Sequence, residues 1–193
     1  KMIQIHDLNF KVKDRFLLQN INIEINKGEL IAIVGPNGAG KSTFLSCLAN
    51  EIAYTTKHFS FKDKDVKSYK KNEIPLHRAK FSQHQSNEIN LRNQEIVLMG
   101  RYPYFKTEAD LSDLEIVEKW MTKTETSHLT DREYEQLSGG EKQRLHLARV
   151  FAQLENNIEN KLLLLDEPLN NLDVAHQFKT LHLIKNFTQN NNT

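Results

Sequence analysis

The N-terminal part of the chain alternates between apolar and polar positions. Nearly every second residue of the first segment is apolar, at Ile3, Ile5, Leu8, Phe10 and Val12. A second alternating segment spans residues 17–25, after a polar stretch at residues 13–15 that has the composition of a turn. Because alternation with period two is typical of a strand with one buried face, the two segments predict an antiparallel pair of strands.

Two uninterrupted apolar segments predict strands that are buried on both faces, as in a parallel sheet. One is LIAIV at residues 30–34, after a polar turn at residues 26–28, and the other is the run of four leucines at residues 162–165. Residues 78–85 have the pattern of a short strand that ends in a polar loop. Residues 57–71 are polar and rich in lysine, which favours a surface hairpin or loop.

Helical spacing of apolar residues appears in the second half of the chain. Such residues recur at Leu111, Leu114, Val117 and Trp120 or Met121, and again at Phe178, Leu181, Ile184 and Phe187. A third helix is predicted over residues 142–152, and Asp110 or Ser112 is placed to cap the first. Helices that alternate with buried strands favour the α/β class, and residues 87–136 have the character of a mainly helical insertion.

The segment GPNGAGKST matches the phosphate-loop pattern G-x-x-x-x-G-K-[ST] at each fixed position. Its residues are Gly35, Pro36, Asn37, Gly38, Ala39, Gly40, Lys41, Ser42 and Thr43. The segment lies between a predicted strand and a predicted helix, where backbone N–H groups and the helix dipole converge on phosphate. In such a loop Lys41 contacts the β- and γ-phosphates and the Ser42 hydroxyl ligates Mg²⁺. The sequence therefore predicts binding of a nucleoside triphosphate with Mg²⁺.

The composition of the chain indicates which partners and which cellular compartment are expected. The chain has 193 residues and a formal net charge of +1, so one domain is expected and bulk charge favours neither nucleic acid nor a membrane surface. Cys47 is the only cysteine, which excludes a disulfide framework and suits a reducing cytosol. No apolar segment approaches the ~20 residues of a membrane-spanning helix and no signal peptide opens the chain, so any membrane role is expected to depend on a partner.

A second glycine-containing segment precedes the helix predicted over residues 142–152. Its sequence is LSGGE, residues 137–141, and it offers a second phosphate-binding helix end with the Ser138 hydroxyl beside it. The four leucines are followed directly by Asp166 and Glu167. At the end of a buried strand, Asp166 is placed to hold Mg²⁺ and Glu167 to polarise an attacking water.

These motifs resemble those of the ATP-binding cassette (ABC) ATPases, and the resemblance covers essentially the whole chain. LSGGE is similar to that family's signature, and two cassettes of the family pair head to tail, so that each ATP lies between one phosphate loop and the other chain's signature. The resemblance implies a P-loop NTPase fold with an N-terminal antiparallel β-subdomain and a helical insertion. It implies a single domain over residues 1–193, with a nucleotide-binding core at 1–86 and 137–193 and a helical subdomain at 87–136.

The resemblance also implies roles for individual residues. Gln83 corresponds to the glutamine loop, which contacts Mg²⁺ and water, and Glu167 to the catalytic glutamate, with Lys41 acting on the phosphates. The γ-phosphate contacts across the dimer correspond to Ser138, Gly139 and Gly140. Asp173 corresponds to the acid of the loop at the dimer interface.

Two departures from the family pattern stand out. The position of the adenine-stacking aromatic aligns with Val12, so Phe10 and Phe16 are the aromatic candidates, each with packing in the core as its alternative. The family's switch histidine follows a later strand, whereas His176 and His182 lie in a predicted helix. We therefore expect that the sequence is a truncated form and that the missing strand lies between residues 30–34 and 162–165.

Less specific sequence similarities indicate one branch of the family. Residues 94–103 resemble a V-x-x-G-R-x-P segment of bacterial iron-chelate and cobalamin importers, and residues 131–134, 148–154 and 172–177 are most similar to haem-importer ATPases. This resemblance implies a homodimer on the cytoplasmic side of the bacterial inner membrane, bound peripherally to a transmembrane permease and served indirectly by a periplasmic or surface solute-binding protein. The eight histidines are scattered, which favours solvated side chains over haem ligands.

Other functions of such a cassette are a soluble ATPase that acts on a macromolecule, in ribosome-associated or DNA-repair work, and a regulatory nucleotide sensor. A single short cassette argues against the first and Glu167 against the second. For the aromatic cluster of Tyr102, Tyr104 and Phe105, two interpretations remain open: lining of a permease-docking groove, or packing under the helical insertion.

Overall fold

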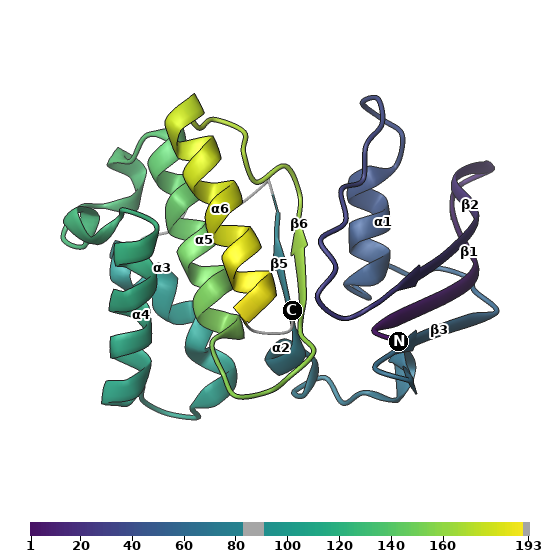
Figure 1. Ribbon diagram of the computed structural model, residues 1–193, viewed down its shortest axis with the longest axis horizontal. Coiled ribbons are helices and arrows are strands. Elements are labelled where there is room, and N and C mark those ends of the chain that lie inside the picture. Colours follow the sequence, from purple (N-terminus) through teal and green to yellow (C-terminus); the bar gives the residue numbers. More distant parts are fainter. Residues whose placement is uncertain (83–90, 191–193) are drawn as a thin grey trace.

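The computed structural model describes residues 1–82 and 91–190 of the chain. Figure 1 shows an antiparallel sheet beside helix α1 (Lys41–Leu48), a pair of parallel strands at the centre, and a group of helices on the far side of those strands. This arrangement of sheet and helix layers agrees with the predicted α/β class.

The N-terminal sheet contains the predicted antiparallel pair. Strands β1 (Ile3–Val12) and β2 (Arg15–Ile25) pair from Ile3 with Ile25 to Val12 with Arg15. Lys13, in the predicted turn, has a positive φ of 52°. The sheet order is β2-β1-β3-β4, so β1 lies inside the sheet and its apolar face is buried.

Residues 57–71 depart in part from the surface hairpin that their composition suggests. They do form a hairpin, β3 (His58–Phe61) and β4 (Lys64–Asp65), followed by the short helix η1 (Val66–Ser68). However, β3 pairs with β1, and Phe59 and Phe61 are only 3% and 7% exposed. The predicted hairpin is therefore confirmed, and most of its lysines are exposed, but pairing with an inner strand turns its two phenylalanines into the core.

The central parallel pair consists of β5 (Arg78–Phe81) and β6 (Leu162–Leu165), with the single turn α2 (Ile74–His77) before β5. The strand predicted at residues 30–34 is not formed, and Leu30 and Val34 are 60% and 91% exposed. Within the described part of the chain, β6 pairs with β5 alone. An apolar segment becomes a strand only where a neighbour accepts its backbone hydrogen bonds, and residues 30–34 have no such neighbour here.

The helical part begins with α3 (Asn93–Leu98), η2 (Met99–Tyr104) and α4 (Leu111–Lys123), and continues with η3 (Ser127–Leu129), η4 (Tyr134–Gln136), α5 (Gly139–Leu154) and α6 (Val174–Asn190). Asp110 caps α4, because its carboxylate accepts the Asp113 N–H at 3.0 Å. Leu111 is 79% exposed, so the buried face of α4 starts later, at Val117, than the leucine spacing suggested.

Strand β6 separates two apolar cores. Leu162 and Leu164 pack with the N-terminal sheet and α1, whereas Leu163 and Leu165 pack with the helices. At the centre of the helical core the rings of Trp120 and Phe151 stack at 4.7 Å between centroids. Asp166 and Glu167 therefore follow directly after a strand that packs against both cores.

Candidate functional site

The phosphate loop runs into the first residue of α1. Gly38 and Gly40 have φ values of 80° and 88°, which favour glycine. A Cβ on Gly40 would lie 3.0 Å from the Leu17 carbonyl oxygen, so the loop lies directly against β2. Lys41 Nζ donates to the carbonyl oxygens of Gly35 and Pro36 at 2.8 Å and 2.9 Å, which places the ammonium group within the loop.

Two residues predicted as Mg²⁺ ligands lie together. The Ser42 hydroxyl, in the first turn of α1, donates to Oδ1 of Asp166, at the end of β6, at 3.0 Å. Mg²⁺ takes oxygen ligands and is held by few protein groups together with phosphate and water. This hydroxyl–carboxylate pair beside a phosphate loop fits that requirement.

Glu167 is held in an uncommon backbone conformation. Its φ is 51°, in the left-handed region that non-glycine residues rarely adopt. The Gln143 side chain donates to the Glu167 carbonyl oxygen at 3.2 Å, and the Asn170 side chain donates to the Glu167 carboxylate. Backbone strain of this kind is typical of functional sites. The sequence analysis did not identify Gln143 or Asn170. For Gln143, the available signal was a glutamine at helical spacing from the apolar residues Leu147 and Val150.

The LSGGE segment forms the beginning of α5. The Glu141 N–H donates to the Ser138 hydroxyl at 3.3 Å, and the Ser138 N–H donates to the Glu141 carboxylate at 2.8 Å. These reciprocal bonds make a capping box. The hydrogen bond from the Ser138 backbone is the main reason that the pKa of Glu141 is lowered. Glu141 therefore fixes the helix end that carries the glycines.

One pocket joins the LSGGE segment to the loop before α6. It is lined by Ser138, Gly139, Gly140, Arg144, Asn171, Leu172 and Asp173. A Cβ on Gly140 would lie 2.9 Å from the Asn171 carbonyl oxygen, so the two segments are in close contact. The residues that line this pocket come from outside the phosphate loop.

Asp173 caps α6. Its carboxylate accepts the His176 N–H at 2.9 Å, and its second oxygen lies 2.7 Å from His176 Nδ1. The backbone hydrogen bond and then the side-chain one lower the pKa of Asp173. Gln83, the predicted glutamine-loop residue, lies outside the described residues.

The aromatic candidates for adenine stacking differ in their surroundings. Phe10 packs against the N-terminal core, whereas Phe16 is 48% exposed. Since Leu17 is the β2 residue that lies against Gly40, Phe16 is next to the phosphate loop along the strand. Val12, at the family's aromatic position, is 46% exposed.

Two buried cations cap the far end of α5, and sequence reasoning missed both. One guanidinium nitrogen of Arg101 donates to the carbonyl oxygens of Ala152 and Glu155 at 2.8 Å and 2.7 Å. Lys161 Nζ donates to the Leu154 carbonyl oxygen at 2.7 Å. Positive charge is favourable at a helix C-terminus, where the last carbonyl groups lack partners. For Arg101, the available signal in the sequence was its position in the G-R-x-P segment.

The aromatic cluster of η2 divides into two environments. Tyr104 donates its hydroxyl to the Gln153 carbonyl oxygen at 2.5 Å and stacks beneath the Arg101 guanidinium at 3.7 Å. Tyr102 is 54% exposed and meets the Phe105 ring edge-on. Tyr104 therefore packs under the helical insertion, whereas Tyr102 lies on an exposed surface.

Among the described residues, no helix combines the length and the apolar character that a membrane span requires.

Comparisons with known proteins agree with these motifs. Residues 18–170 match the family model described as ABC transporter. The hemin import ATP-binding protein HmuV of Vibrio vulnificus is 38% identical over 96% of this chain and 70% of its own length. The HmuV protein of Gloeobacter violaceus is 39% identical over 96% of this chain and 68% of its own length.

Solved structures show the same fold. A metal-chelate type ABC transporter in an inward-facing conformation has a TM-score of 0.79 and 29% identity, covering 100% of this chain and 70% of that one. A nucleotide-free ATP-binding cassette has a TM-score of 0.80 at 18% identity, covering 97% of this chain and 77% of that one, which supports the fold alone. The family match spans the phosphate loop, the LSGGE segment and the Asp166–Glu167 pair, and on this evidence the chain belongs to the ABC transporter family, as one of its ATP-binding and ATP-hydrolysing cassettes.

Proposed function

We propose that this chain is the ATPase subunit of a bacterial importer for haem or another iron chelate or cobalamin. It acts as a homodimer beneath a transmembrane permease, at the cytoplasmic side of the inner membrane, and a periplasmic or surface solute-binding protein delivers the solute. The identification of the solute is supported most directly by the similarity to hemin import ATP-binding proteins over 96% of the chain. The similarity to a metal-chelate type transporter agrees with it.

The roles of the loop residues follow from their positions. Lys41 and the loop N–H groups bind the ATP phosphates, and Ser42 with Asp166 would hold Mg²⁺. When bound, that ion neutralises charge on the β- and γ-phosphates. Glu167 orients the attacking water, and its fixed backbone limits how far its carboxylate moves. Gln83 is the proposed further contact to Mg²⁺ and water.

The second phosphate-binding end explains why two chains are needed. Ser138, Gly139 and Gly140 lie at the beginning of α5 in a pocket whose lining excludes the phosphate loop. A second cassette in head-to-tail orientation would bring its own bound ATP to this helix end. Each ATP is then contacted by both chains, and Asp173 lies in the same contact surface.

The cassette divides into a core and a subdomain. Residues 1–86 and 137–193 form the nucleotide-binding core and residues 87–136 a helical subdomain that contacts the permease. We favour transport over action on a ribosome or DNA because the net charge is only +1 and because both hemin-import relatives match nearly the whole chain.

Reconstitution of the full-length protein with its permease in lipid vesicles tests the proposal. We expect uptake of haem, ferric siderophore or cobalamin to require ATP and the cognate solute-binding protein, with one of the three transported far faster than the others. A matched preparation carrying Glu167→Gln controls for ATP-independent leakage. Stimulation of the ATPase by ribosomes or DNA, with no solute uptake, would instead support the soluble alternative.

A further inference from the structure

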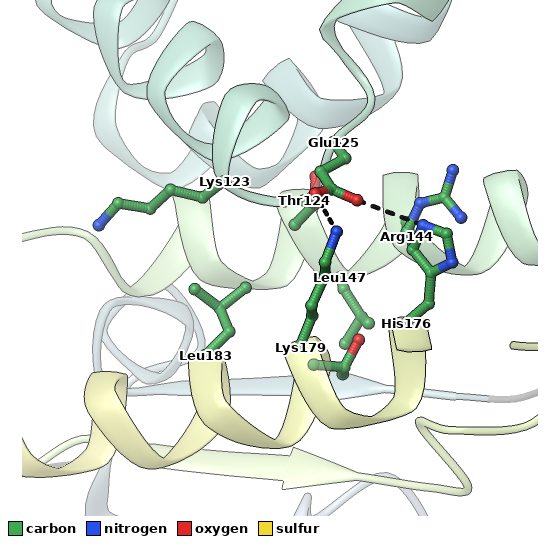
Figure 2. Close-up of a pocket in the computed structure, with 9 residues that line it drawn as sticks. Lys123, Thr124, Glu125, Arg144, Leu147, His176, Lys179 and Leu183 are labelled. Carbon is green, nitrogen blue, oxygen red and sulfur yellow. Dashed lines mark hydrogen bonds and ion pairs between the residues drawn. The ribbon is translucent and has the colours of Figure 1, made fainter. Parts of the chain in front are cut away.

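His176 lies between two carboxylates that come from different parts of the chain. Figure 2 shows one of them, Glu125, facing both His176 and Lys179. Nδ1 of His176 is 2.7 Å from an oxygen of Asp173, at the beginning of α6, and its Nε2 is 3.2 Å from an oxygen of Glu125. Glu125 follows α4 and belongs to the predicted helical subdomain. The imidazole therefore connects that subdomain to the loop that precedes α6.

The two contacts of the ring differ in kind. The Nδ1 contact with Asp173 is a hydrogen bond, whereas the Nε2 contact with Glu125 is an ion pair when the ring is protonated. Three cationic side chains line the same pocket, Lys123, Arg144 and Lys179, and Lys179 Nζ lies 2.6 Å from the second oxygen of Glu125.

Asp173 links this cluster to the LSGGE pocket. Asp173 helps to line the pocket that contains Ser138 and Gly140, and Arg144 lines both that pocket and the one around His176. The Asp173 oxygen that accepts the His176 backbone N–H is separate from the oxygen that contacts the ring. Replacing the ring therefore leaves the helix cap intact and releases only the second oxygen.

We propose that His176 is a positioning residue, which holds the Asp173 carboxylate in the LSGGE half of the ATP site and ties it to Glu125 of the helical subdomain. This inference rests on the proposed function, in which a second cassette completes that half-site. Movement of the helical subdomain then moves Asp173 directly, through one side chain. The ring is 26% exposed and Glu125 46%, and ion pairs exposed to this degree add little to folding stability, so the effect is on geometry.

Two substitutions separate the contacts of the ring. His176→Asn places an amide nitrogen near the position of Nδ1, which keeps the contact with Asp173 and removes the one with Glu125. His176→Gln places an amide group near Glu125 and removes the contact with Asp173. In full-length protein we expect both variants to lower kcat for ATP by roughly threefold to tenfold, with KM for ATP within about twofold of the parent.

Glu125→Gln tests the same link from its other side. We expect a similar loss of kcat, and the double variant H176N/E125Q to be no slower than the slower single variant, because both changes remove one connection. His182→Asn, at an exposed position on the same helix, is the matched control and should behave as the parent. Parental kcat in both His176 variants, or losses that multiply in the double variant, would overturn the proposal.

A measurement without ATP turnover distinguishes failure of this inference from failure of the proposed function. The NMR signal of the Asp173 carboxylate should shift in Glu125→Gln, because the ring contacts both groups, and should not shift in His182→Asn. An unchanged Asp173 signal in Glu125→Gln overturns the bridge even if the protein is an active importer ATPase. If the protein transports nothing, the shifted Asp173 signal would still support the connection between Glu125 and Asp173. A large drop in melting temperature for both His176 variants would show a merely structural role and also overturn it.

Discussion

The Ser42 hydroxyl lies 3.0 Å from the Asp166 carboxylate, although the two residues are 124 positions apart in the sequence. The first belongs to α1 and the second follows β6, so contact between these elements builds the predicted Mg²⁺ site. Strand β6 packs on both faces, with Leu164 in the core that contains α1 and Leu165 against the helical core. The two predicted ligands are thus brought together by the folding of the whole chain.

Glu167→Gln should separate ATP binding from hydrolysis. The amide keeps the size of the side chain but no longer accepts a proton from water, so we expect turnover to fall by roughly two to four powers of ten. ATP binding should persist, and an ATP-bound dimer should accumulate on size exclusion. Lys41→Ala is the contrasting variant, because it removes the ammonium group of the phosphate loop and should lose ATP binding. Parental hydrolysis by the glutamine variant would show that Glu167 is not the residue that orients water.

Gly140→Ala and Gly139→Ala form a matched pair. A Cβ on Gly140 would lie 2.9 Å from the Asn171 carbonyl oxygen, whereas one on Gly139 meets the Asn171 side chain at an ordinary 3.5 Å. We expect Gly140→Ala to displace the loop before α6 and to lower ATPase activity at least tenfold more than Gly139→Ala, an effect of about 1.4 kcal/mol. Binding of ATP by the monomer, measured by fluorescence, should be unchanged in both. Equal activities would show that the contact with Asn171 adapts freely.

Phe16→Ala should weaken nucleotide binding if this ring stacks on adenine. Stacking of a base on an aromatic ring contributes about 1–3 kcal/mol, so KM for ATP should rise roughly fivefold or more. Inorganic triphosphate binding, which involves only the loop, should not change. Phe10→Ala should lower the melting temperature instead, because Phe10 packs against the core. If Val12→Ala raised KM and Phe16→Ala did not, the adenine would lie over Val12.

His146 should make stability depend on pH below neutrality. Its Nε2 lies 2.7 Å from the Tyr134 hydroxyl, and burial, aided by the Arg149 and Lys142 charges, lowers its pKa from 6.5 to about 3. Between these values the unfolded chain binds the extra proton, so the contribution of this group is complete above pH 6.5 and declines as the pH falls toward 3.

Denaturation in urea at about pH 7.5 and about pH 5 measures this effect. The parent should lose more stability between the two values than His146→Gln, which keeps an acceptor for Tyr134 and does not titrate. His182→Gln, exposed on α6, should lose as much as the parent. Identical losses in the parent and His146→Gln would show that His146 is already accessible to protons in the folded chain.

Residues 30–34 and the edge of β6 that faces away from β5 should limit the stability of the 193-residue chain. Leu30 and Val34 are exposed, and among the described residues β6 has a strand neighbour on one side only. Unpaired strand edges favour aggregation, and each buried backbone group without a partner costs about 1–3 kcal/mol. We expect a version extended to the full length of its relatives to melt at a higher temperature and to hydrolyse ATP faster. Equal melting temperatures and equal turnover would show that the edge needs no further strand.

The sequence alone determined the parts of the site that are local in the chain. The phosphate loop, the LSGGE segment and the Asp166–Glu167 pair each lie within a few consecutive residues, so their spacing was enough to identify them. The same holds for Asp110 as the cap of α4 and for the β1–β2 hairpin, which depend on neighbours close in sequence. Helix caps and strand alternation follow from local backbone chemistry.

Only the tertiary structure decided which distant residues meet. The pattern of residues 30–34 predicted a strand that does not form, and the hairpin predicted within residues 57–71 forms but buries Phe59 and Phe61, because β3 pairs with β1. The tertiary structure also placed Arg101 at the end of α5 and His176 between Glu125 and Asp173. Strand pairing, buried charge and side-chain bridges depend on elements far apart in the sequence, and those distances are set by packing of the two cores rather than by any local pattern.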